Sequence, residues 1–364
     1  MVLGGMMIPS ARLGDFLALG RSPAAAVRAA PVVLRYLRDR LTGAPRGTLL
    51  SGGNALVAAL LRSARAAGVE IVTGAAATGL VTEGGRVTGI DLRLGDRATR
   101  IVARNGVLIA TGGFGASDDL TAKRFPDRRR GITHVGLAPA TNTGDGLRLA
   151  LAVGAALRDD AAEPCAWSPV SLVPTAGGRL VPFPHYIDRG KPGVICVDRR
   201  GRRFANEALS YHVFTPELVA RADGEAWIVC DHAAFRRWGL GAAPPSRGSK
   251  GGTCGPDTSC APRRWPSLPG APGSTPPRSR PPSPPSTRPR GAERTPPSDA
   301  ARPPTSARVL DAGGNAIPGL YAAGNDAATP FGGAYPGAGG TIGPAMVFAW
   351  RAARAMAGAG TEPT

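Results

Sequence analysis

A glycine-rich stretch that runs directly into an apolar helical pattern sets the strongest constraint on the fold of this chain. It reads "FGGAYPGAGGTIGPAMVFAW" and covers residues 331–350. Glycine lets backbone N–H groups approach a ligand closely, and a helix N-terminus adds unpaired donors and a positive dipole end. The stretch therefore predicts a cradle for an electron-rich group, followed by a helix over 344–356 in which Pro344 occupies a tolerated early position.

Short apolar strands and amphipathic helices precede this stretch and predict an α/β fold. The composition of segment 23–41 predicts a helix that is broken by proline. A second helix is predicted where apolar residues recur at helical spacing from Leu56 onward, and Gly68 ends it. Residues 69–74 follow as a predicted strand, and 77–94 as a hairpin that turns at 83–85. A buried strand over 107–110 then runs into a glycine turn, where a phosphate, ribose or ring edge is commonly held. A tight turn beneath a helix is the alternative.

Composition excludes several classes of function. The 364 residues suffice for two domains, and the 43% hydrophobic content can build a core. The net charge of +18 would suit a nucleic-acid partner, but 11 Lys and Arg against 3 Asp and Glu fall within 241–308, which carries no nucleic-acid motif. We therefore expect no nucleic-acid partner. The five cysteines form no CxxC pair and predict a reduced, cytoplasmic setting without a metal. No apolar run is long enough for a membrane span, and the N-terminus lacks the layout of a signal peptide.

The segment 241–308 interrupts the folded pattern. It holds 18 of the 36 prolines and no Val, Ile, Met, Phe or Tyr, so it lacks the apolar surface that offsets chain entropy. We expect it to be disordered. A proline-rich ligand for another domain is one interpretation. The abrupt loss and recovery of folded character on either side favours a disturbed reading frame in the gene.

Four blocks together, in this order, resemble one flavoprotein family. They read "ATGGF", "NTGDG", "GRRFANEALSY" and "GLYAAGND…YPGAGGTIGP". The chain resembles the family of fumarate reductase and succinate dehydrogenase, within it the 3-ketosteroid Δ1-dehydrogenase branch, over roughly 1–240 and 309–358. The resemblance implies a doubly wound domain that binds FAD and an inserted α+β domain that caps the flavin and holds the substrate.

The resemblance assigns the cofactor contacts. The residues expected to bind FAD are Thr111, Gly112, Gly113, Asp145, Gly324, Asn325, Asp326, Gly340, Thr341 and Ile342. In the family, the segment 324–326 lies along the ribityl chain and the N–H groups of 340–342 face the pyrimidine edge. A helix N-terminus there would stabilise the negative charge of reduced flavin. Glycines for close helix–strand packing are the alternative.

The resemblance also assigns the catalytic residues. Dehydrogenation between C1 and C2 of a 3-ketosteroid needs a polarised C3 carbonyl, which the Tyr335 hydroxyl and the Gly339 N–H would supply. Tyr211 would be the base for the C2 proton, although a phenol of pKa about 10 needs help to act as one. The family takes this help from a second tyrosine, which the sequence does not place; Tyr36 is a candidate by residue type alone. The residues Leu209 and Ser210 before Tyr211 argue against a dicarboxylate substrate.

The chain departs from the family at its start, where the strand, GxGxxG turn and acidic ribose ligand are missing. We expect a truncated chain with impaired activity. The expected layout is a helical part of the cap region (1–47), FAD-binding parts (48–120 and 309–364), a substrate domain (121–240) and the disordered segment (241–308). Three hypotheses follow: a dehydrogenase of a steroid-like hydrophobic ketone with an unknown electron acceptor, another enone dehydrogenase or reductase of the family, or a non-functional fragment.

Overall fold

The structure is a computed structural model, and it describes residues 2–358 except 4, 20–21, 126, 128–130, 159, 176–177 and 244–306. The segment predicted to be disordered therefore lies outside the described residues except at its two ends. The described residues form two compact units, one from 1–75 with 237–245 and one from 76–236 with 246–364. The predicted domain layout, which divides the chain differently, stays a prediction.

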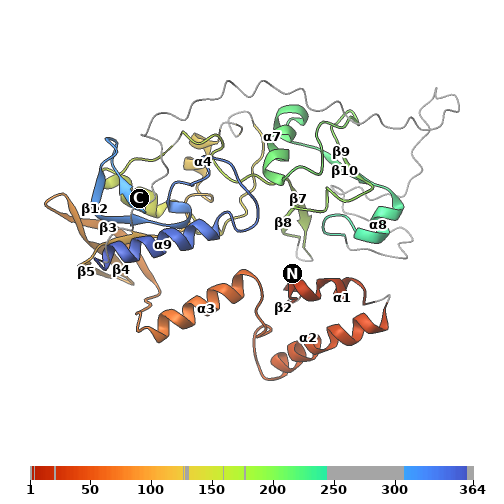
Figure 1. Ribbon diagram of the computed structural model, residues 1–364, viewed down its shortest axis with the longest axis horizontal. Coiled ribbons are helices and arrows are strands. Elements are labelled where there is room, and N and C mark those ends of the chain that lie inside the picture. Colours follow the sequence, from red (N-terminus) through yellow and green to blue (C-terminus); the bar gives the residue numbers. More distant parts are fainter. Residues whose placement is uncertain are drawn as a thin grey trace. The chain divides into compact units, whose positions relative to one another are not determined.

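The first unit is mainly helical (Figure 1). Its elements are β1 (Val2–Leu3), β2 (Met6–Met7), η1 (Ser10–Arg12), α1 (Leu13–Leu17), α2 (Pro23–Leu41) and α3 (Gly53–Ala66). The prediction of a broken helix over 23–41 is wrong, because α2 continues through Pro31. Its start is well defined: Pro23 takes the first position and the Ser22 hydroxyl accepts from the Ala25 N–H at 3.3 Å. A proline within a helix removes one hydrogen bond, and α2 tolerates this loss.

The strand predicted over 69–74 is also wrong. These residues are irregular, and Val69, Ile71 and Val72 are about half exposed. A strand needs a neighbour to pair its backbone groups, and none of the described strands pairs with this segment. The helix before it is confirmed, since α3 ends shortly before Gly68.

The second unit is a mixed α/β structure. Its strands are β3 (Ala75–Glu83), β4 (Arg86–Leu94), β5 (Arg97–Val102), β6 (Val107–Ile109), β7 (Val170–Pro174), β8 (Leu180–Pro184), β9 (Val194–Val197), β10 (Trp227–Cys230), β11 (Arg308–Leu310) and β12 (Ala316–Ala322). Its helices are α4 (Asp118–Arg124), α6 (Asp145–Ala152), α7 (Tyr211–Ala222), η2 (Gly324–Asp326) and α9 (Ile342–Met356), while α8 (His232–Trp238) spans the boundary of the two units.

The strand β12 is the middle strand of a three-stranded sheet in this unit. It pairs in parallel with β6 and antiparallel with β11. Leu320 packs on one face with Val87 and Ile109, and Tyr321 packs on the other with Phe348 of α9. A strand that is buried on both faces consists of consecutive apolar residues, which explains the sequence "LYAA" at 320–323. A parallel pair agrees with the expected α/β class, while the full doubly wound sheet and the inserted cap domain stay predictions.

The predicted hairpin is confirmed, and the sequence analysis missed its third strand. β3 and β4 turn at Gly84 and Gly85, which both have positive φ, as the tight turns of hairpins require. β5 then adds to β4, from Gly89 opposite Val102 to Leu94 opposite Arg97.

The region 160–236 has a core of its own. β9 pairs antiparallel with β10, and β7 with β8. α7 covers the first pair, where Phe204 and Phe214 pack with Cys196 and Ala222. This core fixes the N-terminus of α7, which carries Tyr211 as its first residue.

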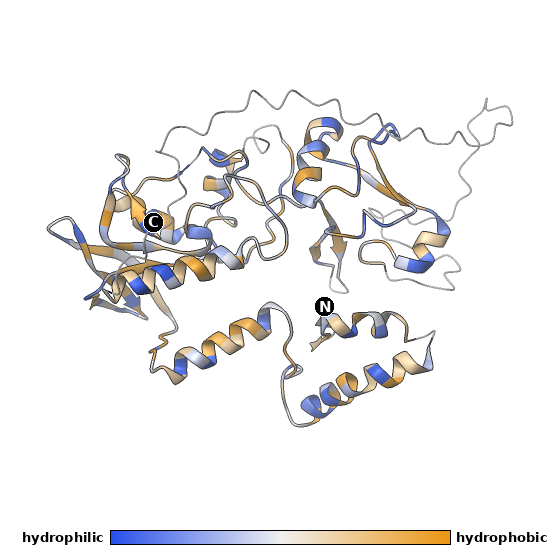
Figure 2. Ribbon diagram, viewed as in Figure 1, coloured by the Kyte–Doolittle hydropathy of each residue, from blue (hydrophilic) through white to orange (hydrophobic). Residues whose placement is uncertain are grey.

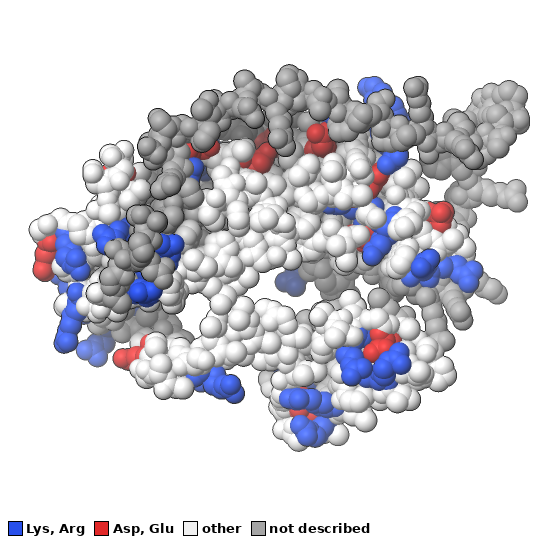
Figure 3. Space-filling view, in the orientation of Figure 1, with Lys and Arg blue, Asp and Glu red and all other residues white. Residues whose placement is uncertain are grey.

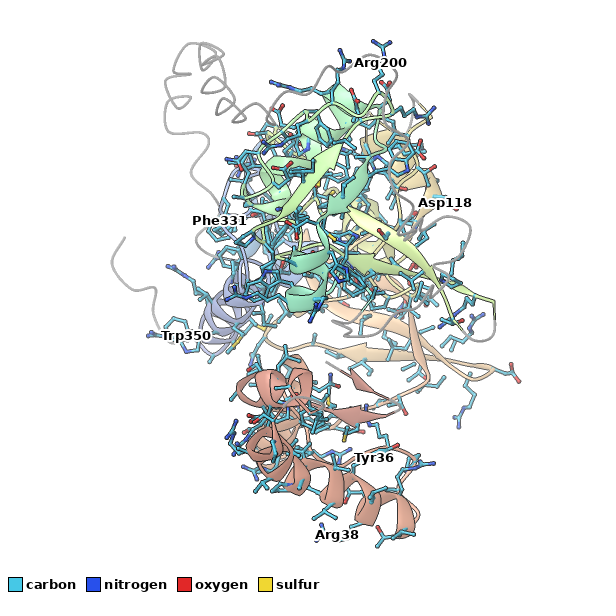
Figure 4. All side chains as sticks on the ribbon, turned by 90° about the vertical axis from the view of Figure 1, so that its right-hand side faces the viewer. Tyr36, Arg38, Asp118, Arg200, Phe331 and Trp350 are labelled. Atoms are coloured by element: carbon cyan, nitrogen blue, oxygen red, sulfur yellow. The ribbon has the colours of Figure 1, made fainter. Side chains whose placement is uncertain are left out.

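Apolar side chains also face outward on some helices. α3 and α9 are largely hydrophobic (Figure 2), and Val57 of α3 and Val347 of α9 are at least half exposed. Trp350 projects from α9 into open space (Figure 4). On the face shown in Figure 3, Lys and Arg form several separate groups rather than one continuous patch. Among the described residues, no helix has both the length and the apolar character needed to cross a bilayer.

Candidate functional site

The ends of β6 and β12 bring distant predicted residues together. Because the two strands are parallel, the turns that follow them lie at the same edge of the sheet. The Asp326 carboxylate accepts hydrogen bonds from the Thr111 hydroxyl and from the Gly112 N–H, each at 2.9 Å. The first glycine turn and the segment 324–326 therefore form one cluster.

Two amides and a helix tighten this cluster. The Asn142 side-chain amide donates to the Gly112 carbonyl at 2.9 Å, and Asn325 donates to the same oxygen at 3.3 Å. The Gly146 N–H, in the first turn of α6, donates to the Thr111 hydroxyl at 3.2 Å. A Cβ on Gly146 would lie 2.4 Å from that hydroxyl, so this glycine is needed for close helix–strand packing. Close helix–strand packing explains this glycine.

Gly337, Gly339 and Gly343 differ from Gly146, because a Cβ on any of these three would meet no atom within 4 Å. Thr341 and Ile342 lie at the start of α9, where the first N–H groups of a helix have no intrahelical acceptor. The Gly340 N–H, in contrast, donates to the Gly337 carbonyl at 3.0 Å and is occupied. The start of α9 thus offers free space together with unpaired donors.

Two further predicted residues lie on adjoining elements. Gly324 is the first residue of η2, two residues before Asp326. Asp145 begins α6, and its carboxylate accepts from the Thr143 hydroxyl at 2.9 Å and lies 3.9 Å from the Arg148 guanidinium. The Asp145 side chain is two-thirds exposed, so it is accessible to a ligand.

These residues fit the flavin and ribityl parts of FAD. The open glycines before α9 leave room for a planar group beside helix N–H donors, which suit the electron-rich edge of a flavin. The carboxylate of Asp326 and the Asn325 amide would be the hydrogen-bond partners of ribityl hydroxyls in the predicted arrangement. Which individual residues touch the cofactor stays a prediction.

Tyr211 and Tyr335 meet, although they are far apart in the sequence. Their ring centroids are 5.8 Å apart, and a hydrogen bond joins their hydroxyls. Burial, the nearby Tyr335 phenol and this hydrogen bond together raise the pKa of Tyr211 to about 12. A hydrogen bond that raises a phenol pKa stabilises the neutral form. Tyr211 therefore rests as a neutral phenol rather than as a ready base.

His212 ties the two tyrosine segments together, a role that the sequence analysis missed. Its Nδ1 accepts from the Trp167 N–H at 3.2 Å, which leaves the proton on Nε2. Nε2 then donates to the Gly333 carbonyl at 3.0 Å, two residues before Tyr335. The ring is buried, as expected for a fixed tautomer between two backbone groups.

The loop before Tyr211 rests on two buried charged residues. Arg189 is 2% exposed, donates to the carbonyls of Glu207 (2.5 Å) and Leu209 (2.7 Å), and stacks on the Phe214 ring. The Glu207 carboxylate accepts from Arg203 at 2.5 Å and from the Cys196 N–H at 2.8 Å. Burial raises the pKa of Glu207, and these hydrogen bonds outweigh it, so its pKa lies below the usual value. The block "GRRFANEA" is thus a scaffold for Tyr211.

A third tyrosine contacts the pair. The Tyr186 ring centroid lies 4.8 Å from that of Tyr211. Tyr36, the candidate by residue type, lies on α2 in the first unit (Figure 4), with its ring against Gly47.

Comparison with known proteins identifies the family. A family model described as an FAD binding domain matches residues 11–272 and 305–342. A 4-oxocyclohex-2-ene-1-carboxylate 5-dehydrogenase of Sinomonas cyclohexanicum is 35% identical over 216 residues, 55% of this chain and 34% of the relative. A 3-oxosteroid 1-dehydrogenase of Mycobacterium tuberculosis is 30% identical over 394 aligned residues, 92% of this chain and 68% of the relative.

The fold agrees with a solved structure. The 3-ketosteroid Δ1-dehydrogenase of Sterolibacterium denitrificans, in complex with 1,4-androstadiene-3,17-dione, matches with a TM-score of 0.69 at 22% identity. The match covers 98% of this chain and 72% of that structure. The chain spans only about a third of the length of the Sinomonas relative. The resemblance expected from the four sequence blocks is confirmed: this chain belongs to the FAD-binding flavoprotein family that includes the 3-oxosteroid 1-dehydrogenases.

Proposed function

We propose that this chain is an FAD-dependent dehydrogenase of a cyclic ketone, with a 3-ketosteroid-like compound as substrate. The observation that carries the proposal is the meeting of Tyr211 and Tyr335, which join hydroxyls across two distant segments. The match over most of the chain to a 3-oxosteroid 1-dehydrogenase supports the choice of substrate class.

The residues have distinct tasks in this proposal. The Tyr335 hydroxyl and the Gly339 N–H bind the ketone oxygen and stabilise the negative charge that develops there. This polarisation makes the neighbouring C2–H acidic, and Tyr211 takes its proton. Bound FAD would supply the acceptor for the hydride that leaves C1. The cluster around Asp326 and the start of α9 hold and orient the cofactor.

A second candidate substrate is a smaller cyclic ketone that carries a carboxylate. The observation that favours it is the 35% identity to the Sinomonas dehydrogenase over 55% of this chain. Both candidates share the chemistry next to the ketone and differ in the size and charge of the rest of the substrate.

Anaerobic flavin reduction tests the proposal. The purified chain is loaded with FAD and mixed with 4-androstene-3,17-dione or with 4-oxocyclohexanecarboxylate. We expect the steroid to bleach the flavin, and an artificial electron acceptor to restore it. Bleaching by the small ketone alone would select the second candidate. No bound flavin, or no bleaching with either compound, would support the third hypothesis, a non-functional fragment.

A further inference from the structure

Three polar side chains that the proposed dehydrogenation does not use are joined by hydrogen bonds. The His185 ring is held at both nitrogens: Nε2 lies 2.7 Å from the Ser171 hydroxyl, and Nδ1 lies 2.6 Å from the Asp188 carboxylate. His185 is only 4% exposed, while Ser171 is partly buried and the Asp188 side chain is 23% exposed. A hydroxyl, an imidazole and a carboxylate in this order are the groups that make a serine nucleophilic in hydrolases.

The Asp188 carboxylate decides which nitrogen of His185 carries the proton. Burial raises the pKa of Asp188, and the hydrogen bond with His185 outweighs it, so this pKa lies below the usual value. Asp188 is therefore ionised at neutral pH and can only accept, which places the His185 proton on Nδ1. In the neutral ring, Nε2 then accepts from the Ser171 hydroxyl. A general base for that hydroxyl needs this arrangement.

The strand that carries Ser171 has a free edge. β7 and β8 form a two-stranded sheet in the described part of the chain (Figure 1), so each pairs along one side only. The His185 N–H donates to the Pro169 carbonyl, and such pairs recur at every second residue of an antiparallel ladder. Ser171 is therefore hydrogen-bonded to Phe183 opposite, and the Leu172 N–H points away from β8. In hydrolases, the N–H of the residue after the nucleophile helps to bind the oxyanion.

The face of the hairpin around Ser171 is apolar. Side chains alternate between the two faces of a strand, and residues opposite each other share a face. Ser171 thus shares its face with Val173, Val181 and Phe183. All three are only partly buried, and the Phe183 ring centroid lies 5.4 Å from that of His185. A neutral, apolar ester suits these surroundings better than a charged one.

We propose that Ser171, His185 and Asp188 form a hydrolase site for small apolar carboxylic esters. The Ser171 oxygen attacks the ester carbonyl, and His185 takes the hydroxyl proton and passes it to the departing alkoxide as the C–O bond breaks. Water then attacks the acyl group on Ser171, with His185 as the base again, and the carboxylic acid leaves. Asp188 orients the ring and stabilises its transient positive charge. The inference is independent of the proposed dehydrogenation and needs no flavin.

A fluorophosphonate probe tests the nucleophile directly. The probe forms an O–P bond with an activated serine and releases fluoride. The chain is incubated with the probe without added FAD and digested, and mass spectrometry locates the label. We expect the label at Ser171, and none in Ser171→Ala or in protein unfolded beforehand in urea.

A neighbouring serine provides the matched control. The Ser168 hydroxyl donates to the Pro169 carbonyl at 3.3 Å, and Ser168→Ala should be labelled like the unchanged protein. A label on another residue, or no label on the folded chain, would overturn the proposal.

Hydrolysis of p-nitrophenyl butyrate, followed by the release of p-nitrophenolate, tests the roles of the three residues. Ser171→Ala should lower kcat/KM at least about 100-fold, the lower end of what a positioned base contributes. Asp188→Asn keeps the size of the side chain but favours the wrong ring tautomer, so kcat should fall by about the same factor with little change in KM. Should one variant fail to fold, the other permits the comparison. Rates within threefold of the unchanged protein would overturn the proposal, because the three residues would then only support the hairpin.

Discussion

At the scale of single residues, the proposed chemistry depends on one hydroxyl that binds the ketone and another that removes a proton. The structure places Tyr335 and Tyr211 in contact, and each is held by groups that do not react. The His212 ring lies beside Tyr335, with centroids 6.1 Å apart, and Arg189 supports the loop before Tyr211.

Removal of the Tyr335 hydroxyl should slow turnover without loss of fold. The substitution Tyr335→Phe leaves one donor on the ketone oxygen instead of two. Loss of one oxyanion donor costs about 2.7–4 kcal/mol, or roughly 100- to 1,000-fold in kcat. Steady-state kinetics with an artificial electron acceptor would measure this. A kcat within threefold of the unchanged protein would show that Tyr335 does not polarise the ketone.

Glu207 should matter for stability rather than for chemistry. It is buried and accepts from Arg203 and from the Cys196 N–H. We expect Glu207→Ala to lower the free energy of unfolding by about 2–3 kcal/mol, because a hydrogen bond to a charged group is lost and a backbone donor is left unpaired. Urea unfolding followed by circular dichroism measures it. The matched control is Glu225→Ala, which breaks an exposed pair with Arg199 and should cost at most about 1 kcal/mol. Equal losses in the two variants would contradict the scaffold role.

At the scale of elements, the loop 331–335 is fixed by contacts that the sequence does not reveal. Gly333 carries one of them: its φ is +94°, and a Cβ there would lie 2.5 Å from the Glu163 nitrogen. The Ala162 N–H donates to the Gly332 carbonyl at 3.0 Å and closes the same contact.

The substitutions Gly333→Ala and Gly337→Ala together distinguish the effect of this contact on stability from the effect of backbone strain. Gly337 also has positive φ, at +123°, but a Cβ there would meet nothing within 4 Å. We therefore expect Gly333→Ala to destabilise the protein by about 1–3 kcal/mol more than Gly337→Ala, the usual cost of overpacking. Thermal or urea unfolding compares the two variants. A loss that is no greater at Gly333 would mean that the loop does not depend on this packing.

The elements that could be predicted were those with local signals. Gly84 and Gly85 marked the hairpin turn, and the apolar period with early Pro344 marked α9. Two predictions were wrong because tertiary context decides them: 69–74 finds no partner strand, and α2 tolerates its internal proline. β5 follows the two-residue turn Gly95–Asp96, a hairpin signal that the sequence analysis overlooked.

Some residues of the predicted site lie together in the structure, whereas the sequence did not indicate contacts that only the fold creates. The sequence blocks indicated Tyr211, Tyr335 and the cluster of Thr111 with Asp326, which do come together in pairs. Nothing local marks Tyr186, since only the fold brings it to Tyr211.

At the scale of the whole molecule, the proposed cofactor contacts account for part of FAD. The Asp326 cluster and the start of α9 suit the flavin and ribityl groups, whereas the sequence contains no strand followed by GxGxxG to receive the pyrophosphate. Each lost charge-assisted hydrogen bond is worth about 1.5–3 kcal/mol. We therefore expect a polypeptide of residues 1–364 alone to bind FAD orders of magnitude more weakly than one in which that turn is present. Fluorescence titration measures the Kd, and a nanomolar value would contradict this expectation.

The central claim is that Tyr211 removes the proton beside the ketone, and solvent deuterium exchange at C2 tests it most directly. The ketone is incubated with the FAD-loaded protein in deuterated buffer, without an electron acceptor, and its mass is followed with time. We predict exchange with the unchanged protein and none above background with Tyr211→Phe, although this variant still binds flavin and its spectrum still responds to the ketone. Near-normal exchange with Tyr211→Phe would show that the base lies elsewhere and would contradict the account.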